Sequence, residues 1–112
     1  MKKKPLGRTG ILVSELCLGT MTFGTQTSEI DAHKQLDLAL DSGINFIDTA
    51  EMYPVNPISK ETIGKTEKFI GKWNNLNAGR RSDYILATKH SGEGLKHCLL
   101  YTSDAADDSG GV

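Results

Sequence analysis

The chain has 112 residues, which is room for at most one domain at the usual size of about 100–200 residues. Thirteen Lys and Arg residues face fourteen Asp and Glu residues, and a net charge of −1 argues against a polybasic surface for nucleic acid or lipid headgroups. No run approaches the ~20 apolar residues of a membrane span, and the two cysteines form neither a disulfide framework nor a zinc motif. We therefore expect a cytoplasmic protein with no metal, no nucleic-acid partner and no membrane contact.

The first apolar runs predict a hairpin and a strand. Residues 4–6 and 11–13 flank a turn that is bounded by Gly7 and Gly10, as in a small β-hairpin. Residues 16–20 form a short apolar run that contains a glycine near its end, which is typical of a buried strand followed by a tight loop.

The next segment predicts an amphipathic helix over residues 29–42. Ser28 and Asp31 have the spacing of a capping box, in which a hydroxyl and a carboxylate bond the free N–H groups at a helix start. Gly43 stands where the first residue beyond a helix is often glycine. The apolar residues that share one helical face are Ala32, Leu36, Ala39 and Leu40.

The following segments predict a second helix between two further strands. Residues 44–49 follow the first helix directly and are mostly apolar, as in a parallel strand that is covered on both faces. After a proline-rich loop, helical spacing predicts a helix over residues 62–74. A polar segment follows, and the apolar run at residues 84–88 predicts another strand. This alternation indicates an α/β fold built from right-handed βα units.

The character of the sequence changes after Gly94. Residues 98–108 do not continue the βα pattern, and they resemble one reading-frame translation of the transposase adapter used in sequencing libraries. We therefore expect residues 1–97 to form the structural unit and residues 98–112 to be a non-native tail. The alternative is a natural acidic tail on a short, non-catalytic chain.

Three polar residues lie at or just beyond the ends of the predicted parallel strands. Asp48 closes one strand, Lys89 follows another, and Tyr53 lies five residues after Asp48. Because the carboxyl ends of parallel strands meet at one edge, these side chains can gather there. A phenol has an ordinary pKa of about 10 and is a poor acid at neutral pH. A neighbouring ammonium makes it a better proton donor, and a carboxylate orients that ammonium.

This trio suits proton delivery to a carbonyl oxygen while hydride reaches the carbon. Each residue also has an ordinary interpretation, because a strand-end Asp is often a cap or turn residue, a loop Tyr usually packs, and a Lys after a strand is usually solvated. The spacing of the three residues alone leaves both interpretations open.

Several blocks of the sequence together resemble the aldo-keto reductase family, over about residues 4–92. The block from Ala50 to Pro54, Ala-Glu-Met-Tyr-Pro, is similar to one bacterial subgroup. The resemblance implies the amino-terminal hairpin and first three βα units of a (β/α)₈ TIM barrel, and hence a fragment of a longer protein. The blocks that carry the resemblance are 6–10, 13–14, 18–24, 43–53 and 64–67.

The resemblance also implies an oxidoreductase that reduces small aldehydes or ketones to alcohols with NADPH. Tyr53 is then the proton donor, Lys89 the cation that strengthens it as an acid, and Asp48 the partner of Lys89. The residues implied to line the nicotinamide and ribose end of the cofactor site are Gly19, Thr20, Met21 and Asp48.

Two features of the family have no counterpart in this sequence. The family's fourth catalytic residue is a histidine after the fourth strand, and we expect His90, beside Lys89, to be a surface or packing residue instead. The main anchors of the adenosine phosphate lie in the last third of the family's chain. We therefore expect the 112-residue chain by itself to be inactive.

A second hypothesis is a regulatory binding protein. Some members of the family, such as the potassium-channel β subunits, resemble the enzymes but serve mainly as partners of another protein. The bacterial-type block that contains Tyr53 favours the enzyme.

Overall fold

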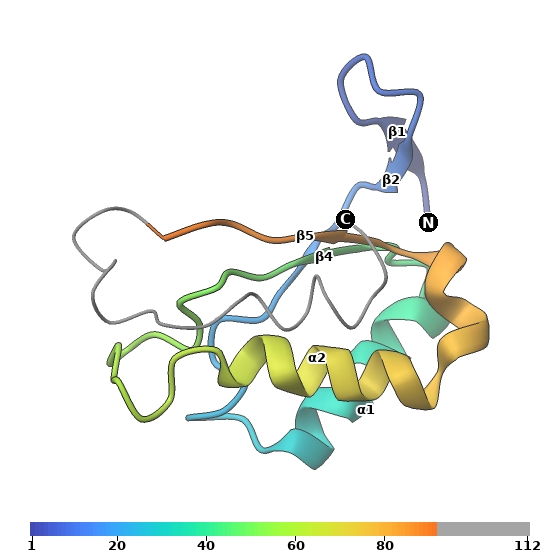
Figure 1. Ribbon diagram of the computed structural model, residues 1–112. Helices are drawn as coiled ribbons and strands as arrows, with labels where there is room; N and C mark the ends of the chain where they lie inside the picture. Colours follow the sequence, from blue (N-terminus) through green and yellow to red (C-terminus); the bar gives the residue numbers. More distant parts are fainter. Residues whose placement is uncertain (92–112) are drawn as a thin grey trace.

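The amino-terminal residues form a hairpin, as predicted, in a computed structural model that describes residues 1–91 (Figure 1). Strands β1 (Lys3–Pro5) and β2 (Leu12–Ser14) pair antiparallel. The turn between them contains Gly7 and Gly10 with φ of +56° and +78°, which is backbone that glycine adopts without a steric cost.

The three remaining strands form a parallel sheet in which β4 is central. β3 (Leu18–Gly19), β4 (Phe46–Asp48) and β5 (Ile85–Ala87) lie side by side in chain order. Asp48, the last residue of β4, is in register with the last residue of each neighbouring strand. The predicted strands are therefore confirmed, although each is shorter than its apolar run.

Helix α1 (Glu29–Asp41) connects β3 to β4 and confirms the predicted helix to within one residue. The hydroxyl of Ser28 accepts a hydrogen bond of 3.2 Å from the backbone N–H of Asp31, so it satisfies one of the free donors at the helix start. Gly43 has φ of +92°, the left-handed conformation that commonly ends a helix.

Helix α2 (Lys65–Leu76) begins three residues later and ends two residues later than the predicted helix over 62–74. Gly64 has φ of +86°, which interrupts helical geometry immediately before the helix. Ile63 fits the apolar spacing because it is buried in the preceding turn. The short 3₁₀ helix η1 (Ala78–Asp83) lies in the segment for which the sequence indicates only polar character.

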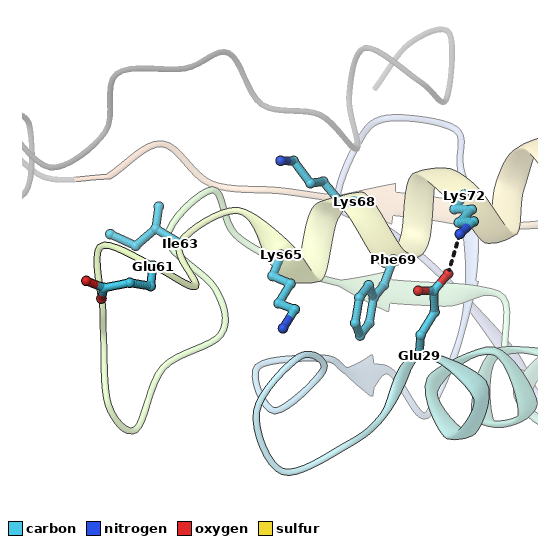
Figure 2. Close-up of a pocket in the computed structure, with 7 residues that line it drawn as sticks. All are labelled: Glu29, Glu61, Ile63, Lys65, Lys68, Phe69 and Lys72. Carbon is cyan, nitrogen blue, oxygen red and sulfur yellow. Dashed lines mark ion pairs between the residues drawn. The ribbon is translucent and has the colours of Figure 1, made fainter.

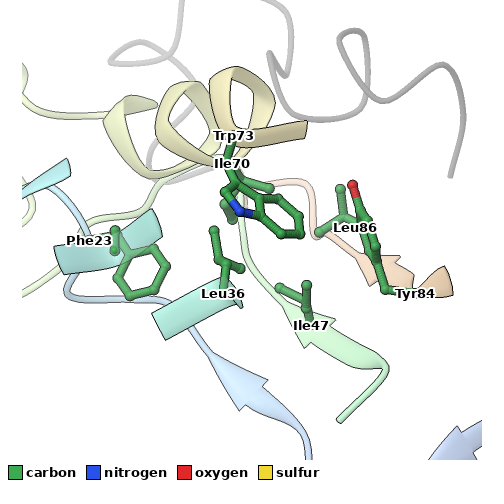
Figure 3. Packing of buried hydrophobic residues seen from close by; sticks show 8 residues of the cluster. Phe23, Leu36, Ile47, Ile70, Trp73, Tyr84 and Leu86 are labelled. Atoms are coloured by element: carbon green, nitrogen blue, oxygen red, sulfur yellow. The ribbon is translucent and has the colours of Figure 1, made fainter. Parts of the chain in front are cut away.

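Both helices cover the same face of the sheet, and one cluster of buried side chains lies between the two layers (Figures 1 and 3). The rings of Trp73 and Tyr84 lie with their centroids 5.3 Å apart. The indole N–H of Trp73 donates to Asp37 Oδ1 at 2.9 Å, so α2 is bonded to α1 at the edge of the cluster. The members of the cluster are Phe23, Ala32, Leu36, Ile47, Ile70, Trp73, Tyr84 and Leu86.

The residues of the sheet that are buried under the helices show which side chains point to the opposite face of the sheet. Ile47 in β4 and Leu86 in β5 are both buried in the cluster. Because successive side chains of a strand point to opposite faces, Asp48 must face away from the helices. The sheet thus has an apolar face toward α1 and α2 and presents Asp48 on its other face.

Two features of the predicted architecture lie outside the described residues. These are the helix of the third βα unit and the tail at 98–112. Within residues 1–91, neither helix has the length and apolar character needed to cross a membrane.

We expect the 112-residue chain by itself to be marginally stable and to show no cooperative thermal unfolding. Among residues 1–91, β3 and β5 each pair on one side only, and both helices lie on the same face of the sheet. Unpaired edges and an uncovered face of a parallel sheet favour association over independent folding. Differential scanning calorimetry measures this directly, and one sharp, reversible transition would contradict the prediction.

Candidate active site

The three residues predicted to carry proton transfer lie together beyond the carboxyl ends of the parallel strands. Lys89 Nζ lies 2.8 Å from Oδ2 and 3.0 Å from Oδ1 of Asp48. The same ammonium donates to the carbonyl oxygen of Thr49 at 2.9 Å. It also lies 5.0 Å from the centroid of the Tyr53 ring, within the range of a cation–π contact. One ammonium therefore contacts both the carboxylate and the phenol.

The pairing of β4 with β5 continues past the strands and brings Lys89 beside Asp48. The backbone N–H of Thr49 donates to the carbonyl of Ala87 at 2.8 Å. Two residues further, the N–H of Glu51 donates to the carbonyl of Lys89 at 3.0 Å. Because a parallel ladder fixes the register of both chains, the alternation of side chains places Lys89 on the same face as Asp48.

The environment of Lys89 both raises and lowers its pKa. Partial burial lowers the pKa of Lys89, but the hydrogen bonds and negative charge of Asp48, with a smaller contribution from Tyr53, outweigh it. The net result is a pKa above the ordinary lysine value of 10.5. Lys89 therefore remains a cation at neutral pH, which is the state that attracts the phenol oxygen.

Backbone hydrogen bonds position the loop that carries Tyr53. The N–H of Tyr53 donates to the carbonyl of Ala50 at 3.1 Å. The carbonyl of Tyr53 accepts from the N–H of Gly64 at 3.0 Å, immediately before α2. The N–H of Val55 donates to the carbonyl of Met21 at 3.1 Å, which joins this loop to the loop after β3. The Tyr53 loop is thus bonded both to α2 and to the neighbouring loop.

The residues predicted to line a cofactor differ in their exposure. Gly19 and Met21 are exposed at the end of β3, and a Cβ built on Gly19 would meet no described atom within 4 Å. Thr20 is only 1% exposed, and its hydroxyl donates to the carbonyl of Asp48 at 2.8 Å. The Thr20 side chain therefore connects β3 to β4 inside the fold, whereas Gly19 leaves free space beside the rim.

The histidines of the described chain lie apart from the Asp48–Tyr53–Lys89 cluster. His90 has a 97% exposed side chain, and its Nδ1 lies 3.6 Å from Glu51 Oε2. His33 in α1 lies with Nε2 3.0 Å from the carbonyl oxygen of Phe69, at the interface of the two helices. His97 lies outside the described residues. Among residues 1–91, no three His, Cys, Asp or Glu residues are grouped closely enough to hold a metal ion.

Two polar residues that are hydrogen-bonded to each other, Glu67 and Thr88, were not identified from the sequence, and Thr88 is next to Lys89 in the chain. Glu67 in α2 is fully buried, and its Oε2 accepts a hydrogen bond of 2.8 Å from the hydroxyl of Thr88. The available signal was position, because Glu67 lies four residues after Ile63 and three before Ile70. A carboxylate on the apolar face of a helix is buried and needs a polar partner.

A separate groove of about 380 Å³ lies on the outside of the helical layer, between α2 and the start of α1 (Figure 2). Lys72 Nζ lies 3.2 Å from Glu29 Oε1 across it. Its charges are mixed, and it contains none of the three clustered residues. The residues that line it are Glu29, Glu61, Ile63, Lys65, Lys68, Phe69 and Lys72.

The α/β arrangement with parallel strands agrees with comparisons to known proteins. The model of the aldo/keto reductase family matches residues 15–108, and the chain belongs to this family. The predicted family and its barrel-type α/β fold are thereby confirmed.

Curated relatives include Protein tas, a protein named as an oxidoreductase and a protein named as a probable channel subunit. Protein tas of Escherichia coli (strain K12) is 51% identical over 92 residues, which is 82% of this chain and 26% of the relative. The "Uncharacterized oxidoreductase YrpG" of Bacillus subtilis is 50% identical over 84 residues, or 75% of this chain and 24% of the relative. The "Probable voltage-gated potassium channel subunit beta" of Oryza sativa is 39% identical over 90 residues, which is 80% of this chain and 25% of the relative.

Solved structures of aldo-keto reductases also match. The holo form of an enzyme from Bacillus halodurans is 41% identical with a TM-score of 0.61, over 79% of this chain and 25% of that chain. A thermostable member in complex with the inhibitor epalrestat is 29% identical with a TM-score of 0.70, over 99% of this chain and 39% of that one. The chain thus spans about a quarter of the length of the curated relatives it matches.

Because the chain matches about a quarter of Protein tas, the cluster can be tested in a complete barrel. In the chimera that we call the tas chimera, residues 1–91 of this chain replace the matching segment of Protein tas. The remainder of the barrel then comes from the relative.

In the tas chimera, we expect Asp48→Asn to lower the pKa of Lys89 toward or below 10.5, because partial burial is then opposed less strongly. A raised lysine pKa means that the folded protein favours the charged lysine. The ion pair therefore stabilises the fold below pH 10.5, and this contribution is lost as the pH rises through the pKa of the folded protein. Carbon-detected NMR of the lysine Cε signals measures the midpoint.

The matched control is Asp41→Asn, which removes a carboxylate that pairs with Arg80 at 3.6 Å. This variant should leave the titration of Lys89 where it is in the parent. If Asp48→Asn and Asp41→Asn give the same Lys89 midpoint, the ion pair does not control the charge of Lys89.

Proposed function

We propose that the Asp48–Tyr53–Lys89 cluster reduces aldehydes or ketones to alcohols with NADPH in a complete barrel of this family. The observation that supports this most strongly is the position of Lys89 Nζ, which contacts the carboxylate of Asp48 and the ring of Tyr53 at once. Family membership and the oxidoreductase relative support the same class of reaction.

In this proposal, Tyr53 is the general acid. Its O–H bond breaks, and the proton forms the O–H bond of the alcohol on the former carbonyl oxygen. Lys89 supplies a positive charge beside the phenolate that remains, and the two opposite charges attract each other. Asp48 accepts two hydrogen bonds from the ammonium and so orients it.

The open end of β3 fits the proposed cofactor. NADPH, when bound, supplies the hydride that reduces the carbonyl carbon. Gly19 and Met21 would hold its nicotinamide and ribose end beside Asp48, since both are exposed and no described atom fills the space at Gly19. Thr20 would contribute through its backbone, because its hydroxyl already bonds the carbonyl of Asp48.

A regulatory role is the second candidate, and the potassium-channel β subunit among the relatives is the observation that favours it. A protein of this kind would retain the fold without depending on proton transfer. The two candidates therefore differ in whether the parent protein turns over a carbonyl substrate, and in whether that turnover depends on Tyr53.

We expect Tyr53→Phe in the tas chimera to lower kcat by about 10²–10⁴-fold, the usual contribution of a positioned general acid. NADPH binding should survive, because the substitution removes only the phenol oxygen. Oxidation of NADPH at 340 nm with an aromatic aldehyde measures turnover, and quenching of protein fluorescence measures binding.

Tyr84→Phe is the control, since it removes the hydroxyl of a buried tyrosine of the core that bonds Asn74. Correctly folded Tyr84→Phe should retain the parent kcat. Undiminished turnover in Tyr53→Phe would disprove the role assigned to Tyr53, whereas absence of turnover in the parent tas chimera would favour the regulatory candidate.

A further inference from the structure

The start of α2 is bonded to the loops that follow the first two strands of the parallel sheet. Thr66 Oγ1 donates to the carbonyl of Phe23 at 2.5 Å, in the loop after β3. The N–H of Gly64 donates to the carbonyl of Tyr53 at 3.0 Å, in the loop after β4. Thr66 is fully buried, so the first of these bonds is shielded from water. The first turn of α2 thereby fixes two of the three loops that form the rim.

Glu67, also in the first turn of α2, bonds the third loop, which follows β5 and contains Thr88 and Lys89. Its fully buried carboxylate accepts a hydrogen bond of 2.8 Å from Thr88 Oγ1, and Thr88 immediately precedes Lys89. Since successive side chains of an extended segment point to opposite faces, Thr88 faces the helices while Lys89 faces Asp48. The backbone between these two side chains is therefore held from both faces.

We propose that Glu67 is a positioning residue for proton transfer, which acts through Thr88 to hold Lys89 in contact with Tyr53 and Asp48. This inference rests on the proposed function of the cluster. Glu67 is argued to act through its hydrogen bond with Thr88, so it is a positioning residue and not a catalytic one.

Two physical properties suit Glu67 to this task. The hydrogen bond between Thr88 and Glu67 lies at a fully buried carboxyl group, and shielding from water strengthens the electrostatic attraction within such a bond. Glu67 also lies in the first turn of α2, directly after Thr66, which bonds the loop after β3. Ile70 and Trp73 of the same helix are buried in the core, so α2 is a rigid support.

Thr88→Val in the tas chimera tests the proposal most sharply, because it removes the hydroxyl that bonds Glu67 with little change in shape. We expect kcat to fall by up to about 10²-fold, the effect of a displacement on the order of 1 Å at a reacting group. The KM for NADPH should stay within about twofold, since no residue at the end of β3 is altered.

Three further variants separate positioning from general stability. Thr88→Ser restores the hydroxyl and should return kcat to within about threefold of the parent. Glu67→Gln keeps one oxygen that can accept a hydrogen bond from Thr88, and its kcat should lie between those of the parent and Thr88→Val. Thr62→Val is the matched control, because it removes a threonine hydroxyl that donates to the carbonyl of Ser59 at 3.3 Å, in the turn before α2, and not to Glu67.

NMR titration of Lys89 gives a readout that is independent of activity. Thr88→Val should lower the Lys89 midpoint relative to the parent, because a displaced ammonium loses part of its contact with Asp48. Thr88→Ser and Thr62→Val should leave it unchanged.

The outcomes distinguish this inference from the proposed function. If Tyr53→Phe abolishes turnover while Thr88→Val retains both kcat and the Lys89 midpoint, the positioning role of Glu67 is wrong and the catalytic cluster stands. If Thr88→Val and Thr62→Val lower kcat equally, the loss is one of general stability and the inference is overturned. If Tyr53→Phe leaves turnover intact, the proposed function fails, and with it the inference that depends on it.

Discussion

The contact between Lys89 and Asp48 depends on the register of two neighbouring parallel strands. The ladder from β4 to β5 continues beyond both strands, so the ammonium lies within 3.0 Å of both carboxylate oxygens. A shift of one residue would turn one of these side chains toward the helices. The phenol of Tyr53 would then lose the cation beside it. The chemistry proposed for this rim is therefore a consequence of backbone pairing.

Helix α2 supports that register while it also completes the core. Its apolar face places Ile70 and Trp73 against the sheet, and the polar residues of its first turn bond the loops. Since a packed interior resists displacement, hydrogen bonds to such a helix restrict the movement of the loops. Packing and positioning are thus performed by one element, and the fold needs no separate structure to order the rim.

Local signals in the sequence predicted much of this arrangement. The cap at Ser28 and the glycine at 43 located α1 to within one residue, because both act on the nearest backbone groups. The start of α2 was predicted three residues too early, since Ile63 is buried without being helical. Apolar spacing reports burial, and a buried turn satisfies the same pattern as a helix.

The sequence by itself determined the order of the elements, the family and the three residues that gather at the rim. Strand alternation and parallel pairing carry that information in the identity and spacing of residues. Only the tertiary structure decided that Thr20 bonds the carbonyl of Asp48 and that Glu67 bonds Thr88, because each pair is more than twenty residues apart along the chain. Periodicity indicates which face of an element is buried, but the partner of a buried polar group depends on how the elements pack in three dimensions.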